Sequence, residues 1–494
     1  MINHPFIDFL KTLSKDEVQK YGDFISSPYF NKKSRLMKLF NALIKNYPGF
    51  NDEWFNKKNL YQKLYPGKVY HDSTIRDMLS DLLQLSKEFL IVNNFNINNP
   101  EFLDILLSQC VSRNLKSQFF KSIDSAENIL SQSRLDSKFF LSKYILESNK
   151  YNFNVLNSKF TKIEHVIEQF DEIKKCELYF LLYFILEFVS DYVKIFLFSM
   201  SYNIGQKVEL YDEVMNNVDI EKIYQTLKGK TEYDFILELY LKLLYAFKYY
   251  TKDKFYKDYK SALTKISNVL SNNELTFHYS NLINYCVLRK SKSKDSLKYN
   301  LELFEIYKTV LKEGYFKDST SAFLDKILYR NILFLALKLN EHEWVKYFIS
   351  NYSSLLNNKV RKNMMYYSYV YLYYDLENYE KALNYLNKIN LDYFIYKYDV
   401  YNIKVKIYYE LKYYESALGL IHTYKQYIRN DKVLEYSMKA GHNNFLKYAE
   451  QLILNKLGKK NTDLVYLKRS IEKMDNVFQR KWLIEKILYN PANN

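Results

Sequence analysis

Histidine, cysteine and carboxylate side chains most often ligate metals or move protons, but their spacing in this chain suits neither task. The chain has seven histidines. None forms HxxxH or HExxH, and the segment HEW at His342 lacks a second histidine one helical turn later. His165 shares a predicted helical face with Glu168 and with Cys176, yet two ligands do not complete a zinc site. The sequence therefore predicts no metal site.

Phosphate-binding loops and nucleophile elbows are also missing from the sequence. Backbone N–H groups can cradle phosphate only where glycine permits close approach, and the chain has nine glycines with neither GxGxxG nor GxxxxGK[ST]. LKGK at 227–230 is too short, and no GxSxG occurs. Glu187 and Asp191 are spaced i, i+4, a pairing that is common on solvated helix faces. We expect no catalytic residues, no cofactor and no enzymatic activity.

Residues 56–92 have the order of short helix, turn and longer helix that helix-turn-helix DNA-binding modules share. The side chains that would face a DNA groove are Ser73, Thr74, Arg76 and Ser80. Asp72, Asp77 and Asp81 lie on the same predicted helix and would repel the phosphates, whose attraction dominates affinity for DNA. An ordinary helical cap is the alternative interpretation of this segment.

The basic composition permits an anionic partner but does not require one. The net charge of +16 comes from 62 lysines and only 10 arginines. Arginine is the residue that recognises phosphates and bases in a bidentate manner. The abundance of Lys, Asn, Ile, Tyr and Phe is the pattern that AT-rich codons produce. The 51 tyrosines and 34 phenylalanines could stack on bases or contact proteins, but most are expected in the core and in grooves.

Cysteine usage and hydropathy predict a cytoplasmic protein. Cys110, Cys176 and Cys286 are far apart, so they form neither a disulfide framework nor a zinc ribbon. The first residues, MINHPFIDFLKTL, lack the basic flank and apolar run of a signal peptide. The apolar segment 178–200 carries Glu187, Asp191 and Lys194 on one face, so we expect a largely buried helix and no membrane span.

Apolar residues recur at helical spacing along nearly the whole chain, and 494 residues with only nine Gly and six Pro favour long helices over turn-rich sheets. The sequence therefore predicts an all-α protein. Residues 1–97 are expected to form a non-repeating helical block, with a capping box at Ser14 and Glu17 and helix breaks at Pro28 and Pro48. Residues 98–231 are expected to form irregular helical hairpins. Residues 232–494 are expected to form regular hairpins that begin near 233, 274, 319, 359, 394, 432 and 462.

One sequence motif occurs twice in the C-terminal part of the chain. YYDLENYEKALNYLNKI, residues 373–389, and YYELKYYESALGLIHTY, residues 408–424, lie 35 residues apart, and LKLNEHEWVKYFI, residues 337–349, is a degenerate third copy. Glu377 and Asn378 are expected to turn the chain between two helices. Ala382 and its counterpart Ala417 are small where two helices must approach closely. Stacked hairpins need the same apolar helix face to recur after each repeat, because each hairpin buries that face on the next one.

These features resemble tetratricopeptide (TPR) repeats. The period of 35 is close to the usual 34, and NYEKAL and YYESAL place an aromatic residue before an acidic residue and an alanine. The sequence departs from the family pattern where Val370 and Val405 replace a small residue, and where the closing proline is missing. The resemblance is clearest over residues 359–428. It implies a right-handed α-solenoid whose first helices line a concave groove.

In that register the groove-facing residues are Tyr367, Tyr371, Tyr374, Asn402, Lys406 and Tyr409. Asn402 and Lys406 resemble the polar pair with which some TPR domains hold a terminal carboxylate of a peptide. The resemblance thus implies an interaction scaffold for a protein or peptide partner. The alternative is a nucleic-acid-associated regulator, with residues 56–92 as reader and the repeats as sensor. A membrane-associated scaffold is the third hypothesis.

Overall fold

The structure is a computed structural model of the whole chain. It describes residues 2, 4–50, 56–94, 100–157, 163–202, 213–214, 217–292, 295–317, 323–391, 396–432, 434–460 and 463–488. Within these ranges the regular elements are helices, and the only β-type pairing is an isolated bridge between Leu135 and Leu270. The predicted all-α class is confirmed for this part of the chain.

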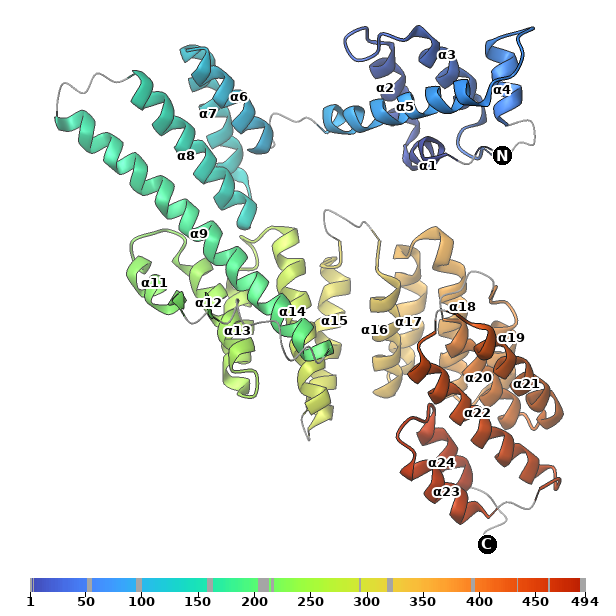
Figure 1. Cartoon of the computed structure of the whole chain (residues 1–494). Coiled ribbons are helices and arrows are strands. Elements are labelled where there is room, and N and C mark those ends of the chain that lie inside the picture. The colour runs from blue at the N-terminus through green and yellow to red at the C-terminus, as the bar shows by residue number, and fades with distance from the viewer. Residues whose placement is uncertain are drawn as a thin grey trace. The chain divides into compact units, whose positions relative to one another are not determined.

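The chain divides into two compact units, which are described separately (Figure 1). The first unit comprises residues 1–133 and 138–183, and the second comprises residues 134–137 and 184–494. The division falls within α9, Ile163–Tyr202. The three domain ranges expected from the sequence stay a prediction.

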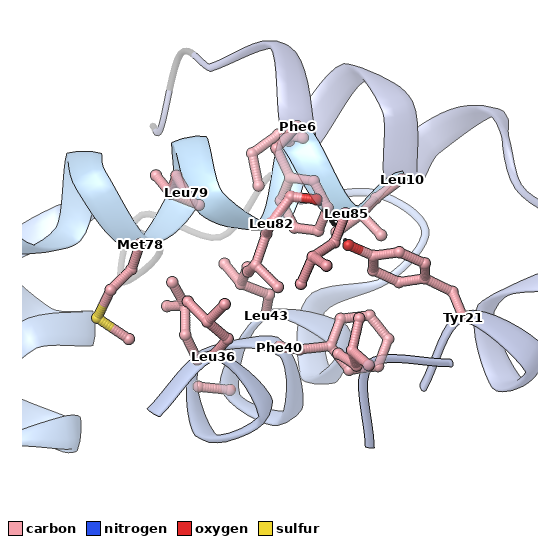
Figure 2. Packing of buried hydrophobic residues seen from close by; sticks show 14 of the residues in the cluster. Phe6, Leu10, Tyr21, Leu36, Phe40, Leu43, Met78, Leu79, Leu82 and Leu85 are labelled. Carbon is pink, nitrogen blue, oxygen red and sulfur yellow. Dashed lines mark hydrogen bonds between the residues drawn. The ribbon is translucent and has the colours of Figure 1, made fainter. Parts of the chain in front are cut away.

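The first unit begins with a block of five helices around a core of its own. These are α1 (Pro5–Thr12), α2 (Lys15–Ser26), α3 (Ser34–Leu43), α4 (Lys57–Leu64) and α5 (Asp72–Asn93). Helix α5 contacts each of the other four, and its apolar face supplies Leu79 and Leu82 to the core (Figure 2). The buried Tyr21 hydroxyl of α2 donates to the Leu82 carbonyl oxygen at 2.7 Å. A buried hydroxyl needs such a partner, because leaving it unpaired costs about 1–3 kcal/mol.

The predicted helix boundaries in this block are confirmed at two points. The Ser14 hydroxyl accepts from the Glu17 N–H at 3.2 Å, and the Glu17 carboxylate accepts from the Ser14 N–H at 2.7 Å, which completes the capping box of α2. Helix α2 ends at Ser26, two residues before Pro28. This end is expected because proline has no backbone N–H to donate to the helix.

Further helices complete the first unit. They are α6 (Pro100–Ser112), α7 (Lys116–Gln132), α8 (Ser137–Asn157) and the first half of α9. Phe119 of α7 stacks on Phe153 of α8 with ring centroids 4.2 Å apart. On α9, the apolar segment 178–200 carries an Asp191–Lys194 ion pair at 2.9 Å on its polar face. Nowhere in the described residues does a helix combine the length and apolarity that crossing a bilayer requires.

The second unit consists of helices that follow one another along the chain. Its helices after α9 are α11 (Ile220–Leu227), α12 (Asp234–Lys248), α13 (Asp253–Ile266), α14 (Asn272–Lys292), α15 (Ser296–Glu313), α16 (Lys326–Lys338), α17 (His342–Tyr352), α18 (Asn358–Asp375), α19 (Tyr379–Leu386), α20 (Lys397–Glu410), α21 (Tyr414–Asn430), α22 (Tyr436–Lys456), α23 (Leu464–Lys473) and α24 (Arg480–Leu488). Each of α11–α22 contacts its neighbour in sequence. Helix α18 also contacts both α16 and α20. The helical hairpin expected to begin near 432 is wrong, because a single helix of 21 residues, α22, occupies Tyr436–Lys456.

The repeated phrase corresponds to a repeated turn. Glu377, Lys412 and Asn340 adopt φ angles of 57°, 60° and 60°, the left-handed conformation in which helices commonly end. The N–H of Asn378 donates to the Tyr373 carbonyl oxygen at 2.8 Å, and the equivalent bonds in the other two copies measure 2.8 and 3.0 Å. These bonds satisfy a carbonyl group that the helix end would leave unpaired. The expected turn between α18 and α19 is therefore confirmed, and the buried Ala382 and Ala417 follow it at equal positions.

Candidate functional site

The six residues predicted to line a groove divide into two groups. Tyr367, Asn402 and Tyr409 are buried, whereas Tyr371, Tyr374 and Lys406 are half-buried. The first group lies between α18 and α20, because the first helix of one helix pair contacts the first helix of the next pair. Their role in binding stays a prediction, and the half-buried residues are the ones whose side chains a partner could reach.

An ion pair that the sequence did not reveal joins α16, α18 and α20. Arg330 of α16 donates to the Asp399 Oδ2 of α20 through Nε at 2.9 Å and through Nη2 at 2.6 Å. The Tyr367 hydroxyl of α18 donates to the same oxygen at 2.8 Å. The guanidinium also lies over the rings of Phe334 and Tyr396, with its carbon 4.6 and 5.2 Å from their centroids. Burial lowers the pKa of Arg330, but Tyr367 and Asp399 together raise it above its usual value, so the guanidinium stays charged and is paired with Asp399.

The Asn402 side chain is buried and accepts a hydrogen bond within the protein. The Tyr424 hydroxyl of α21 donates to Asn402 Oδ1 at 3.1 Å and lies 2.9 Å from His442 Nδ1 of α22. Burial lowers the pKa of His442 to about 4, so the ring is neutral at physiological pH. The three side chains therefore form a neutral buried network that joins three helices.

Lys406 has the opposite character. Its Nζ lies 4.5 Å from the centroid of the Tyr374 ring and 3.5 Å from Gln479 Oε1. It forms no ion pair within 4.0 Å with a residue that the structure describes. Burial lowers the pKa of Lys406 to about 8, so the amine is still mostly charged at pH 7. An ammonium group held in this way is a candidate contact for an anion.

Lys406 borders a cavity of about 400 Å³ between α18, α20 and α24. Three of the four carboxylates around it are paired with other groups, and the fourth, Glu377, is exposed. Glu410 accepts from Trp482 Nε1 at 3.0 Å and from Lys486 Nζ at 2.8 Å. Asp375 lies 2.6 Å from His342 Nε2, and Glu485 lies 3.7 Å from Lys481 Nζ. The cavity therefore combines carboxylates and aromatic rings with an amine that has no ion pair within 4.0 Å among the described residues, although Glu410, Glu485 and Asp375 act on it from a longer distance.

A second cavity, of about 410 Å³, is lined by Arg330, Asp399, Asn402 and His442, among others. Gln479 borders both cavities. Asn402 and Lys406 are one turn apart on α20, yet they border different cavities. The structure thus does not bring this predicted polar pair to one anion site.

The DNA-binding alternative rests on α4 and α5. Residues 65–71 separate these helices, a longer connection than the three or four residues of a helix-turn-helix. Ser73, Arg76 and Ser80 are exposed, and Thr74 is half-exposed. Asp72 pairs with Lys57 at 3.2 Å, and Asp81 pairs with Lys33 at 2.8 Å. The pairing reduces the repulsion expected from these acids, and the alternative stays a prediction.

A buried cluster of proton-bearing side chains lies between α12, α13 and α14. The Tyr259 hydroxyl is 2.7 Å from His278 Nδ1, Glu274 Oε1 is 3.1 Å from His278 Nε2, and the Tyr240 hydroxyl donates to Glu274. Desolvation raises the pKa values of Tyr240 and Tyr259. The only sign of this cluster in the sequence is the i, i+4 spacing of Glu274 and His278. All four side chains are buried, so the cluster stabilises the packing of these helices and is closed to a substrate.

The candidate metal ligands His165, Glu168 and Cys176 are not joined by further ligands. The described residues contain no group of three or more His, Cys, Asp or Glu side chains that could hold a metal ion. Cys176 is half-buried, and burial together with Glu147 and Glu172 raises the pKa of its thiol to about 11.

Comparison with known protein families, with curated proteins and with solved structures gives no match to this chain.

Proposed function

We propose that the second unit contains a TPR-like solenoid that acts as a non-enzymatic scaffold and binds a peptide segment of a partner protein. Three kinds of observation support the arrangement. The turns at Asn340, Glu377 and Lys412 share one geometry, first helices contact the next first helices, and cavities open on the face that these helices form. Solenoids of this kind use such a face to hold extended partners. Three free cysteines suit the cytoplasmic location that this proposal includes.

The single observation that carries the proposal is the amine of Lys406. A half-buried ammonium that forms no ion pair within 4.0 Å with a described residue is costly, and a ligand carboxylate could supply the closer charge. Tyr374 and Trp482 add aromatic surface to the same cavity. A carboxylate of the partner, flanked by an apolar or aromatic side chain, would meet both features. We therefore propose a carboxylate-bearing peptide as the ligand.

The experiment compares peptides that differ only in this charge. Arrays of peptides with free and with amidated C-termini, and with Asp or Asn inside, are probed with the wild-type chain and with Lys406→Met. The control is Lys404→Met, which removes the same charge from the same helix at a site where the amine lies 5.5 Å from the ring centroid of Tyr408. Wild type and the control are expected to prefer carboxylate-bearing peptides by at least about tenfold, a preference that Lys406→Met loses.

The proposal fails if the wild-type chain does not distinguish the paired peptides, or if both lysine variants behave alike. Tyr371→Ala is a poor probe of this site. The Tyr371 hydroxyl donates to the Asp399 carbonyl oxygen at 3.2 Å, and its ring packs edge-on against Phe334 at 4.7 Å. Removing that ring would therefore disturb the packing of α16, α18 and α20 as well as the groove.

A further inference from the structure

A cavity of about 880 Å³ lies between α13 and α15, within the second unit. It shares no described lining residue with the two cavities of the proposed peptide site. Asp253, Lys257, Lys260 and Thr264 of α13 line it at spacings of i, i+4, i+7 and i+11, so one face of this helix forms one wall. Proteins commonly bind small organic ligands in cavities of about 300–1,000 Å³. The size of this cavity therefore fits a small molecule.

Two buried tyrosines give the cavity a rigid apolar floor. Tyr256 of α13 stacks on Tyr285 of α14, with ring centroids 4.2 Å apart and an angle of 9° between the rings. Tyr299 of α15 is held under the guanidinium of Arg289, whose carbon lies 5.2 Å from the centroid of the ring. Leu301, which is 50% exposed, adds apolar surface to the lining. Because the rings are packed in place, the site is formed before a ligand arrives.

The carboxylate of Asp253, which lines the cavity, is paired within the protein. Lys298 Nζ forms an ion pair with its Oδ2, and Arg289 Nη2 lies 3.2 Å from its Oδ1. The Tyr299 hydroxyl donates to Oδ1 at 2.6 Å. Burial raises the pKa of Asp253, but Lys298 and Tyr299 together lower it below its usual value, so the group is ionised at neutral pH. Its negative charge is therefore already balanced.

The two other carboxylates of the described lining are paired as well. Glu302 Oε1 accepts from Lys260 Nζ at 2.6 Å and from the Tyr256 hydroxyl at 2.7 Å. Glu305 lies 2.8 Å from Lys308 Nζ. No carboxylate of the described lining is thus left to hold a cationic ligand.

Two lysines of α13 that line the cavity have no such partner. Lys257 and Lys265 are exposed and form no ion pair within 4.0 Å with a residue that the structure describes. Their positions are about 12 Å apart along the helix axis, and Ser261, whose hydroxyl can donate, lies between them in the sequence. Just outside the lining, Lys254 and Asp258 carry opposite charges and offset each other. The cavity therefore combines an apolar floor with an excess of positive charge.

We propose that this cavity binds a small organic anion, in which a carboxylate or phosphate group is attached to an apolar body. The body would cover Tyr256, Tyr299 and Leu301, and the anionic group would lie within reach of Lys257 and Lys265. A cationic ligand would meet two like charges and no free carboxylate of the described lining. An inorganic anion would leave the apolar floor in contact with water, so it would gain nothing from the burial of that surface.

Two fluorescent probes that differ only in charge test this proposal with the full chain. 8-Anilinonaphthalene-1-sulfonate carries a sulfonate in place of the carboxylate or phosphate, and N-phenyl-1-naphthylamine is the same body without the charge. Lys257→Met is expected to lower the ratio of the affinities for the charged and the neutral probe by at least about fivefold. Lys254→Met removes the same charge from the same helix outside the lining and is expected to keep the ratio. Ser261→Trp fills the cavity and is expected to weaken both probes by at least about tenfold.

Hydrogen exchange locates the bound probe, and circular dichroism verifies that the variants keep the helical content of the wild type. The sulfonate probe is expected to slow exchange in peptides from α13 and α15 and not in peptides from α20. Laurate and 1-naphthoate, as competitors, then distinguish an aliphatic from an aromatic body. The proposal is overturned if neither competitor displaces the probe, if protection appears only in other helices, if the two lysine variants behave alike, or if Ser261→Trp binds as the wild type does.

Discussion

Replacing Lys406 by methionine is expected to stabilise the helices around the cavity even though it removes a proposed binding contact. Burial lowers the pKa of Lys406 from 10.5 to about 8. One pKa unit corresponds to about 1.4 kcal/mol, so holding the charged amine there costs at most about 3 kcal/mol. The side chain is only half-buried and its amine lies 4.5 Å from the Tyr374 ring centroid, and both facts reduce the cost. We therefore expect Lys406→Met to add about 1–2 kcal/mol.

The pH dependence of this gain has a definite sign. Below pH 8 the amine is charged in the folded and in the unfolded chain, so the folded wild type bears the whole cost. Between pH 8 and 10.5 the unfolded chain binds more protons than the folded one, and the wild type gains stability as the pH rises. The difference between Lys406→Met and wild type should therefore be largest at neutral pH and small near pH 10.5.

Hydrogen exchange of peptides from α18 and α20 measures this difference locally, which suits a chain of two units whose global unfolding need not be two-state. A gain of about 1.4 kcal/mol slows exchange about tenfold in these helices. Peptides from α12 serve as the internal reference, and Lys404→Met serves as the matched variant. Faster exchange in Lys406→Met than in wild type would refute the reasoning, because it would show that the amine stabilises the fold.

Three further predictions concern neighbouring groups. Arg330→Met removes the cation that pairs with Asp399 and should speed exchange of α18 and α20 by about 30-fold, and adding Asp399→Asn should recover part of that loss, because no unpaired charge then remains. The pKa of His442 is about 4 against 6.5 in the unfolded chain, so protection of α22 should fall as the pH drops from 6.5 to 4, and His442→Gln should abolish this dependence. Lys412→Val, which places a β-branched side chain at a φ of 60°, should destabilise α20 and α21 by about 1–2 kcal/mol, measured as faster hydrogen exchange of peptides from these helices, whereas Lys412→Gly should not speed their exchange.

Local features of the fold were predictable because they depend on residues close in sequence. The capping box of Ser14 and Glu17 needs only a four-residue segment. The turn at Glu377 was found because its phrase recurs at 35 residues, and the recurrence held although glutamate and lysine, rather than glycine, occupy the left-handed position. The expectation of a hairpin near 432 was wrong because it could not rest on such a recurring motif. Helix α22 shows no internal copy of the phrase, and its length follows from packing that sequence periodicity does not report.

The candidate site was only partly predictable because its contacts join distant parts of the chain. The register named both Lys406 and Tyr374 as groove residues, and the structure places the Lys406 amine 4.5 Å from the Tyr374 ring centroid, whereas their role in binding stays a prediction. The register could not show that the Tyr367 hydroxyl donates to a carboxylate oxygen of Asp399, which lies 32 residues later in the chain. Nor could it show that Arg330, 69 residues before Asp399, donates to the same oxygen. Pairings of this kind depend on how closely one hairpin approaches the next, and that distance has no signature in a single sequence.

The C-terminal helix limits what the proposed site can hold. Trp482 and Lys486 of α24 bind Glu410, the last residue of α20, from 72 and 76 positions away. Trp482 is buried in the core that α20, α21, α22 and α24 share, so α24 is a fixed wall of the Lys406 cavity. An extended partner that follows the first helices from α16 towards α20 therefore meets this wall at Lys406. The geometry favours a ligand that ends there, and a chain terminus, whose carboxylate would complete the pairing of Lys406, satisfies both the wall and the charge.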